Sequence, residues 1–254
     1  MEQRSSEWQR IRLGKLTASE IYVLMKDRKE PMTEEELAAH KAANPKSRTT
    51  TKIVPFSDAT FTYLNRKVME RFLPLNSESI DAMNVVDDYI LEHSVQNAAM
   101  RFGTEWEDTA RQRYAETMGY EVFEVGFVPY EKYPNIVGVS PDGLNRQENG
   151  GVEIKSPFTM EKHLQHLMYQ TPQDLKENEE EYYWQCYANM LVTNRDFWDF
   201  VSFNPYVYYS KQLKVLRIQR DESEINLLAE RIDLAVDYMI RKMEEIESVQ
   251  TIIK

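Results

Sequence analysis

The sequence has one cysteine, Cys186, and only four histidines in 254 residues. A single cysteine excludes a disulfide within the chain, and it excludes zinc or iron–sulfur sites that need four cysteines of one chain. Long apolar runs are also missing: no stretch of about 18 apolar residues occurs, so a membrane-spanning helix is not expected. The opening run, MEQRSSEWQR, contains no apolar signal core. These absences predict an intracellular protein in a reducing compartment, without a membrane partner.

Positive charge is in short supply over the whole chain, whose net charge is −11. Such a balance is unusual for a protein that binds nucleic acid. Its distribution is uneven, however, because Lys and Arg outnumber Asp and Glu in residues 1–75, while the remainder is strongly acidic. Local rather than total charge decides where a polyanion can bind. If DNA is the substrate, we expect residues 1–75 to form much of its binding path.

An acidic residue at the end of one apolar run is followed by an E-x-K pattern in the next. Asp142 precedes Glu153-Ile154-Lys155 by eleven residues. Side chains two apart on a strand share a face, so Glu153 and Lys155 project together while Ile154 points into the core. The turn at 149–151 folds the second strand back beside the first and brings Asp142 towards Glu153.

Two carboxylates and one ammonium group then converge at a strand end. Oxygen ligands of this kind suit Mg²⁺ or Mn²⁺, and the lysine can orient a water or neutralise a developing oxyanion. This layout is typical of a metal-dependent phosphodiesterase. The pattern is short and common, and taken alone it more often marks a Ser-Pro-Asp-Gly turn followed by an exposed strand pair. Val152 and Ile154 favour a buried strand, however, in which charges need a reason.

A second group of polar residues lies near the N-terminus. Thr17 and Glu20 form a capping-box pattern, which predicts a short helix to about Met25. Ser19 then lies in the first turn, where free backbone N–H groups favour an anion. Arg12, just upstream, is suited to binding a phosphate. The alternative is a capped helix with solvated charges.

Hydrophobic periodicity and turn residues predict both helices and strands along the chain. Helices are expected at 57–72, 95–118 (ended by Gly119), 159–169, 182–193 and 225–246. Strands are expected at 121–128, 136–140, 151–155, 197–203 and 213–218. Residues 29–56 are expected to form a solvated loop, in which Thr33 and Glu36 can cap a short helix and basic residues offer a DNA-contacting arm as an alternative. A second solvated loop is expected at 176–181.

Three of these helices carry polar residues that need an explanation. Glu107 lies four residues before Arg111, which predicts either a surface ion pair or a third carboxylate facing the metal site. Gln185 is the polar exception in an apolar helix, where it satisfies a neighbour or, beside an active site, holds a water or scissile phosphate. His163 and His166 are expected on the polar face of their helix.

Five motifs follow one another in a recognisable order. They are W-x3-RLG-x2-TAS-E at the start, G-x3-E-x2-AR in the long helix, SPDGL, the run E-I-K-S-P-F-T, and Y-x-x-Q before a helix end in V-T. With these motifs the sequence resembles the lambda exonuclease and YqaJ-like viral recombinase nuclease family, from Trp8 to about Pro205. The resemblance implies an α/β, PD-(D/E)xK restriction-endonuclease-like fold, with a mixed central sheet flanked by helices. It weakens across residues 29–95 and after 205.

The resemblance also implies a metal site. Glu107, Asp142 and Glu153 correspond to the metal-binding carboxylates of the family, and the carbonyl of Ile154 corresponds to a further ligand. Two Mg²⁺ ions are implied as cofactors, for which Mn²⁺ can substitute.

Other positions correspond to residues that act on the DNA. Lys155 matches the catalytic lysine, which orients or deprotonates the attacking water, and Gln185 matches the glutamine beside it. Arg12 and Ser19 match the pair that holds the terminal 5′ phosphate. Glu161 departs from the family pattern, because the best-known member has arginine there.

The implied activity is a 5′-to-3′ exonuclease that degrades one strand of linear double-stranded DNA with 5′-phosphate ends to mononucleotides. It leaves a 3′ single strand for a single-strand annealing protein. A homotrimeric ring and a phage or prophage origin, with action in the bacterial cytoplasm, are implied as well. We expect one nuclease domain over 1–254, with an N-terminal, DNA-end-binding part (1–75), a catalytic core (95–220) and a C-terminal helix (221–254). The alternatives are an endonuclease or repair nuclease of the same fold, or a non-catalytic DNA-binding or annealing module.

Overall fold

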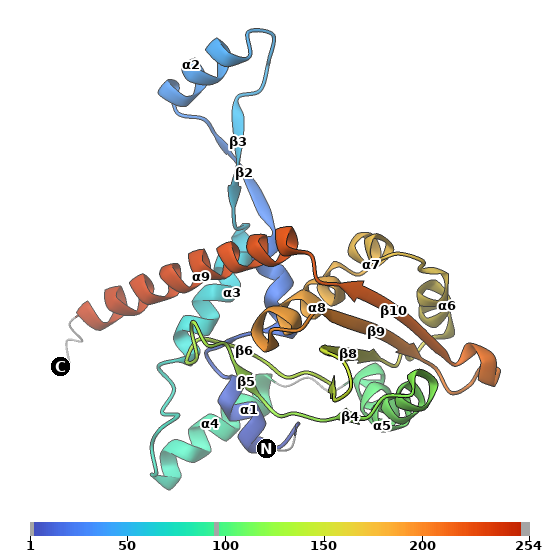
Figure 1. Ribbon diagram of the computed structural model, residues 1–254. Helices are drawn as coiled ribbons and strands as arrows, with labels where there is room; N and C mark the ends of the chain where they lie inside the picture. The colour runs from blue at the N-terminus through green and yellow to red at the C-terminus, as the bar shows by residue number, and fades with distance from the viewer. Residues whose placement is uncertain (1–2, 94–96, 250–254) are drawn as a thin grey trace.

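A mixed five-stranded sheet forms the centre of the computed structural model, which describes residues 3–93 and 97–249 (Figure 1). In spatial order its strands are β10 (Leu213–Gln219), β9 (Phe197–Phe203), β8 (Gly150–Lys155), β7 (Gly143–Asn145) and β4 (Val122–Phe123). β8 and β9 run parallel, whereas the other neighbours run antiparallel. Both β8 and β9 are buried along almost their whole length, as strands covered on two faces are.

Helices cover both faces of this sheet. α5 (Ala98–Met118) packs on one face and α8 (Glu180–Thr193) on the other, and α9 (Glu222–Ser248) packs against α8. Side chains alternate along a strand, so Val201 of β9 packs with the α5 cluster while Trp198 and Phe200 pack with α8 and α9. The predicted α/β fold with a mixed central sheet between helices is confirmed.

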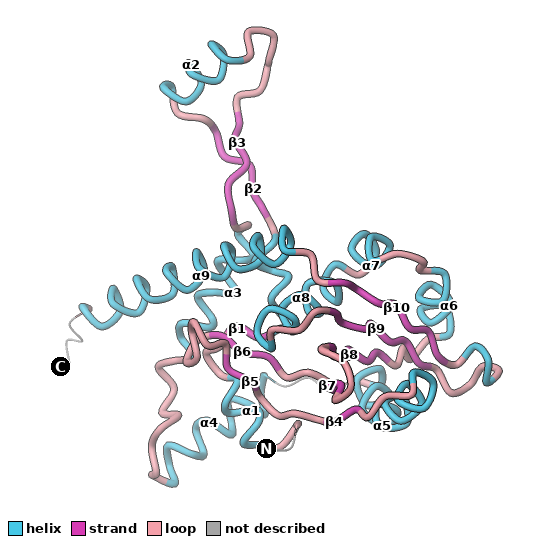
Figure 2. The backbone as a smooth tube through the Cα atoms, viewed as in Figure 1, coloured by secondary structure: helices cyan, strands magenta, loops and turns pink. Residues whose placement is uncertain are grey.

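A second sheet of three strands lies beside the first (Figure 2). Its order is β1 (Leu16–Thr17), β6 (Val137–Val139) and β5 (Val128–Pro129), and it carries α1 (Ser6–Arg12) and the 3₁₀-helix η1 (Ala18–Met25). The single strand expected at 121–128 is therefore wrong, because β4 and β5 belong to different sheets.

The expected pairing of 136–140 with 151–155 is also wrong. Pro141 has no N–H to donate and follows the end of β6, and β7 takes the place next to β8. Asp142 lies at this crossing between the two sheets.

Residues 27–55 project from the body as an arm (Figure 1). It consists of β2 (Asp27–Pro31), β3 (Thr51–Pro55) and, at its tip, α2 (Glu34–Ala43). The solvated loop expected at 29–56 is wrong, although the capping box of Thr33 and Glu36 forms as predicted. The sequence does not predict β2 and β3, because this two-stranded sheet buries no apolar face that would require alternating apolar and polar residues.

The remaining helices are α3 (Asp58–Glu70), α4 (Ile80–His93), α6 (Met160–Met168), α7 (Pro172–Asn178) and the 3₁₀-helix η2 (Tyr209–Lys211). Ser57 caps α3, and Gly119 ends α5 with a φ of 71°, as predicted. The expected start of that helix, Val95, lies outside the described residues. The loop expected at 176–181 is wrong, because Thr171 and Asp174 cap α7 and α8 begins directly after it. In the described ranges, no helix has the length and apolarity needed to cross a bilayer.

His163 and His166 are not on a solvated face, which corrects their predicted placement. Each is 1% exposed, and their Nδ1 atoms lie 2.9 and 2.8 Å from Ser202 Oγ. His163 Nε2 lies 2.8 Å from the Lys211 carbonyl, so it carries the proton and donates it. The two rings therefore join α6 to β9 as part of the interior.

Candidate active site

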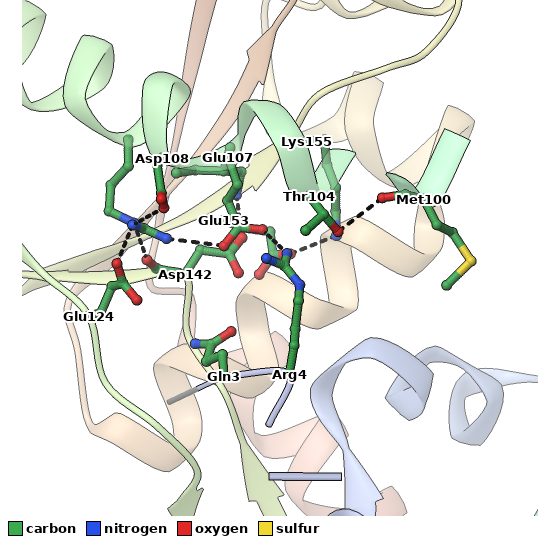
Figure 3. Close-up of polar contacts among 12 residues, drawn as sticks. Gln3, Arg4, Met100, Thr104, Glu107, Asp108, Glu124, Asp142, Glu153 and Lys155 are labelled. Carbon is green, nitrogen blue, oxygen red and sulfur yellow. Dashed lines mark hydrogen bonds and ion pairs between the residues drawn. The ribbon is translucent and has the colours of Figure 1, made fainter. Parts of the chain in front are cut away.

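Three carboxylates and a lysine meet near the end of β8 (Figure 3). Glu153 and Lys155 project from one face of β8, Asp142 comes from the crossing between the sheets, and Glu107 comes from α5. The Ile154 N–H donates to Asp142 Oδ2 at 2.7 Å and holds that carboxylate against the strand. Glu153 is 1% exposed, and Glu107 is 9% exposed.

Helix α8 positions Lys155 and Glu153 from the opposite side. Lys155 Nζ lies 2.7 Å from Glu153 Oε1 and donates to Gln185 Oε1 at 3.2 Å. The ring of Tyr182 lies 4.6 Å from the same ammonium group. One turn after Gln185, Asn189 donates its Nδ2 to Glu153 Oε2 at 3.2 Å. The polar side chains of an otherwise apolar helix thus share one face.

Glu107 lies at the carboxylate cluster, and its predicted pair with Arg111 is not a surface pair, since the two side chains are only 12% and 11% exposed. Arg111 Nη2 donates to Glu107 Oε1 at 3.0 Å, so the i,i+4 ion pair forms. Arg111 Nε also donates to the carbonyl of Asp142 at 2.8 Å, which ties α5 to the crossing between the sheets. Arg4 pairs with the other oxygen of Glu107.

Burial and mutual repulsion govern the charges of this cluster. Burial raises the pKa of Asp142 well above its usual value, and Glu153 and Glu107 raise it further. Burial raises the pKa of Glu153 too, although Lys155 works against it. For Lys155, burial lowers the pKa, but Glu153 and Asp142 outweigh this effect, so that its pKa is raised. Lys155 is therefore a cation at neutral pH, and the carboxylates repel one another.

The donor set suits a hard divalent cation. Three carboxylates and the Ile154 carbonyl offer only oxygen, the ligand atom that Mg²⁺ and Mn²⁺ prefer, and carboxylates that repel one another gain from a shared cation. Within residues 3–93 and 97–249, no three His, Cys, Asp or Glu side chains already enclose such a position. Arg4 and Lys155 hold oxygens of Glu107 and Glu153 instead, so metal binding requires these contacts to open.

The cluster faces a cavity of about 550 Å³. Glu107, Ile154 and Lys155 line it, and the Lys155 side chain is 24% exposed. A second cavity of about 680 Å³ adjoins the first, since both are lined by Arg4 and Met100.

Arg12 lines the second cavity. Its Nη2 donates to Ser19 Oγ at 3.0 Å, and its guanidinium lies 4.1 Å from the ring centroid of Trp8. Burial lowers the pKa of Arg12, an effect that the nearby Glu20 opposes. The predicted capping box is wrong, because the Thr17 side chain makes no capping hydrogen bond and the turn that follows is a 3₁₀-helix. Arg12 and Ser19 nevertheless lie together.

Two residues at the site escaped the sequence analysis. Asn189 carried a signal, since it lies four residues after Gln185 on the same helical face. No sequence pattern marks Arg4, because its contact with Glu107 depends on how the N-terminal segment is anchored. Gln3 Nε2 donates to the carbonyls of Val125 and Pro141 at 3.0 and 2.8 Å, and Arg4 itself has a φ of 67°.

Residues 7–196 match the model of the YqaJ-like viral recombinase domain. This range is most of the chain. The chain belongs to this family.

Solved structures agree with the family. An alkaline exonuclease (LHK-Exo) from Laribacter hongkongensis is 25% identical over 96% of both chains, with a TM-score of 0.65. The complex of LHK-Exo with dAMP gives 24% identity, a TM-score of 0.66 and the same coverage. A phage related exonuclease from Haemophilus somnus 129PT, 16% identical with a TM-score of 0.58, covers 91% of this chain and 96% of its own. No curated protein matches the sequence.

These matches confirm the predicted PD-(D/E)xK-type fold. The YqaJ-like family and its exonuclease neighbours together indicate a nuclease. The roles of single residues in this member of the family stay predictions.

Proposed function

We propose that this YqaJ-like protein is a metal-dependent 5′-to-3′ exonuclease that degrades one strand of linear double-stranded DNA to mononucleotides and leaves a 3′ single strand. One observation carries the proposal. Glu107 and Lys155 of the cluster line one cavity and Arg12 lines the adjoining one, with Arg4 and Met100 common to both. A strand end held at Arg12 therefore has its first phosphodiester bonds close to the cluster.

Glu107, Asp142, Glu153 and the Ile154 carbonyl are the groups that would hold the metal. Bound Mg²⁺ or Mn²⁺ supplies water activation and stabilises the leaving 3′ oxygen. Arg111 and Asn189 keep two of these carboxylates in place through the bonds described above, and such supporting contacts orient metal ligands.

Lys155 acts as a positioned cation. Glu153 and Asp142 raise its pKa against the effect of burial, which favours the protonated form while these carboxylates hold no metal. Gln185 accepts a hydrogen bond from Lys155 and directs the ammonium towards the cavity. From there the ammonium can orient a water and neutralise charge on the phosphate.

Arg12 and Ser19 give the reaction its polarity. The guanidinium is stacked on Trp8 and donates to Ser19, so it is presented in one orientation. A guanidinium forks onto phosphate oxygens, and a 5′ phosphate carries more negative charge than an internal diester. A strand with a 5′ phosphate is therefore selected at its end.

Partners follow from the family resemblance rather than from surfaces of this chain. We propose a homotrimer that encircles the duplex and an annealing protein that receives the 3′ strand. Closed cyclic assembly satisfies subunit surfaces without open growth. The apolar stripe of α9 does not serve as the interface, because Ile225, Leu228, Ile232 and Met239 pack inside the chain.

Linear duplex labelled at either end tests the function. With Mg²⁺ we expect label on a 5′ nucleotide to appear first as mononucleotide, while label on a 3′ end stays on long single strands. Nicking of covalently closed circles would favour the endonuclease instead, and binding of duplex without any cleavage would favour a non-catalytic module.

A further inference from the structure

A third cavity, of about 690 Å³, is lined by two cations and no carboxylate. Lys15 and Arg71 share its wall with Leu13, Asn135 and the loop at 73–77. The absence of acidic residues from this lining is notable in a chain whose net charge is −11. Lys15 belongs to the motif that supplies Arg12 and Ser19, yet the proposed function gives it no part.

Neither cation has a carboxylate partner among the residues that the structure describes. Most other basic residues near them do have one; the pairs include Arg4–Glu107, Arg10–Asp87, Arg66–Glu20 and Lys67–Glu70. Lys15 Nζ lies 5.8 Å from the ring centroid of Phe127, and all three acceptors of Arg71 are uncharged.

Three hydrogen bonds hold the Arg71 guanidinium in place at the wall of the cavity. Its Nη1 donates to the Asn135 carbonyl at 2.8 Å and to the Gly14 carbonyl at 3.4 Å, and its Nε donates to Met243 Sδ at 3.2 Å. Gly14 makes room for this arrangement, because a Cβ there would lie 2.5 Å from Arg71 Cγ. Gly14 also has a φ of 66°, which favours glycine.

Both cations are destabilised by burial. Burial lowers the pKa of Lys15, and the charge of Arg71 lowers it further. Burial also lowers the pKa of Arg71. Two half-buried cations without a counterion are stabilised by a bound anion, and a guanidinium beside an ammonium suits the oxygens of a phosphate.

The three cavities have an order. The first cavity, beside the carboxylate cluster, shares Arg4 with the second cavity, which Arg12 lines. The second cavity shares Leu13 with the third, whereas the first and the third share no lining residue. A 5′ phosphate at Arg12 is the end of its strand, so that strand does not continue into the third cavity. The complementary strand does continue past this end and is single-stranded there.

We propose that Lys15 and Arg71 bind a phosphodiester group of the undegraded strand just behind the end that is being degraded. The inference rests on the proposed exonuclease function and adds a site to it. Contact with the released strand keeps the enzyme on DNA between successive cleavages.

The test compares two 5′-phosphorylated duplexes, one blunt and one with a 3′ single-stranded tail, by fluorescence anisotropy at several salt concentrations in EDTA. The wild type is expected to bind the tailed duplex more tightly, with a salt dependence steeper by roughly 0.7 for each phosphate contact. Lys15→Gln and Arg71→Gln are expected to lose about tenfold in affinity for the tailed duplex and the extra salt dependence, with blunt binding unchanged.

Two further variants control this result. Lys15→Arg keeps the charge and should keep the tail preference. Lys242→Gln removes the same charge from α9, where Lys242 pairs with Glu245, and should behave as wild type. If Arg71→Gln does not fold, because its carbonyl contacts are lost, Lys15→Gln decides alone.

Three results would overturn the proposal. If Lys15→Gln keeps the preference for the tailed duplex, Lys15 does not bind the released strand. If the variant loses affinity equally for both duplexes, Lys15 contributes only a general electrostatic attraction to DNA. Calorimetric binding of inorganic phosphate that Lys15→Gln abolishes, with an intact tail preference, assigns the cavity to free phosphate. Cleavage in Mg²⁺ is measured in parallel: a protein that never cleaves DNA refutes the proposed function itself, whereas a protein that cleaves with an unaltered tail preference refutes only this site.

Discussion

Adjacent strands of the central sheet each bury a carboxylate, Asp199 on β9 and Glu153 on β8, and the two carboxylates differ in their charged neighbours. Asp199 of β9 accepts hydrogen bonds from Arg217 Nε and Nη2 at 2.9 and 2.8 Å and from the Tyr114 hydroxyl at 2.6 Å. Glu153 of β8 contacts Lys155 and Asn189, but Asp142 and Glu107 repel it. Asp199 is a closed ion pair, whereas Glu153 belongs to a cluster of three carboxylates in which Asp142 forms no salt bridge within the described residues.

The difference teaches that burial of an acid does not by itself indicate function. A buried charge that is fully paired serves the fold, and breaking such a pair is costly. A buried carboxylate that lacks an ion-pair partner and lies beside other carboxylates at a cavity is unfavourable until a cation enters, and perturbed electrostatics of this kind are typical of functional sites. Asp199 should therefore matter for stability, and Glu153 for catalysis.

The largest expected effect separates these two acids directly. Glu153→Gln keeps the size of the side chain but removes a metal-binding charge, so the cleavage rate should fall by on the order of 10³ or more while the fold persists. Asp199→Asn should lower the free energy of unfolding by about 3 kcal/mol, because Arg217 loses its charged partner, yet keep near-normal activity per folded molecule.

Initial rates on 5′-phosphorylated linear duplex and urea unfolding measure both variants. Near-normal cleavage by Glu153→Gln would contradict its role, and full stability of Asp199→Asn would contradict the closed pair.

Lys155 should produce the next largest effect. Lys155→Ala removes the cation that faces the cavity, and we expect a rate loss on the order of 10²–10⁴. If Lys155 acts as a cation rather than as the base, the dependence of the rate on pH near neutral pH should have the same shape in the wild type and in the variant. Lys162→Ala is a control, since Lys162 lines the same cavity but pairs with Glu179. A loss of similar size in both variants would argue against a specific role of Lys155.

Arg12 should affect the choice of substrate more than the rate. Arg12→Ala loses a charge-assisted contact, and the preference for 5′-phosphate over 5′-hydroxyl ends should fall by about tenfold or more. Arg10→Ala, which breaks the exposed ion pair of Arg10 with Asp87, should leave that preference unchanged. The ratio of kcat/KM for the two duplex ends is the measurement. A wild type without any preference would make Arg12 structural.

The sequence predicted those parts of the site that depend on local periodicity. Glu153 and Lys155 share a face because strands alternate, and β8 formed where the pattern placed it. Gln185 was conspicuous because the residues on either side of it, Trp184 and Cys186, are apolar. The five ordered motifs indicated the fold, which the structural matches confirm.

Features set by long-range packing were beyond such patterns. Arg4 reaches Glu107 only because Gln3 anchors the N-terminal segment to chain more than a hundred residues away. His163 and His166 were misplaced, since their burial depends on Ser202 of a distant strand. The arm was offered only as an alternative and its strands were not predicted, because β2 and β3 pair without an apolar face and no periodic signal marks them.

The smallest expected effect concerns the free energy of unfolding in the absence of metal. Replacing the acid by asparagine should raise this free energy at Asp142 and lower it at Asp199. Burial, Glu153 and Glu107 raise the pKa of Asp142 above its unfolded value, so the folded state binds the proton more tightly. The free energy of unfolding contributed by this group therefore falls as pH rises from the unfolded pKa through the folded one. Asp142→Asn keeps an oxygen for the Ile154 N–H but carries no charge.

In EDTA at pH 7 we expect Asp142→Asn to be more stable than wild type by on the order of 1 kcal/mol, whereas Asp199→Asn is less stable. Added Mg²⁺ should make the wild type more stable than Asp142→Asn. Binding of the ion to the folded wild type adds about 2.7 kcal/mol to the free energy of unfolding when the free ion is a hundredfold above Kd, whereas the variant has lost a ligand. Urea unfolding with and without Mg²⁺ measures both effects. If Asp142→Asn were the less stable protein in EDTA, repulsion would not dominate the cluster, and the distinction between the open site on β8 and the closed pair on β9 would fail.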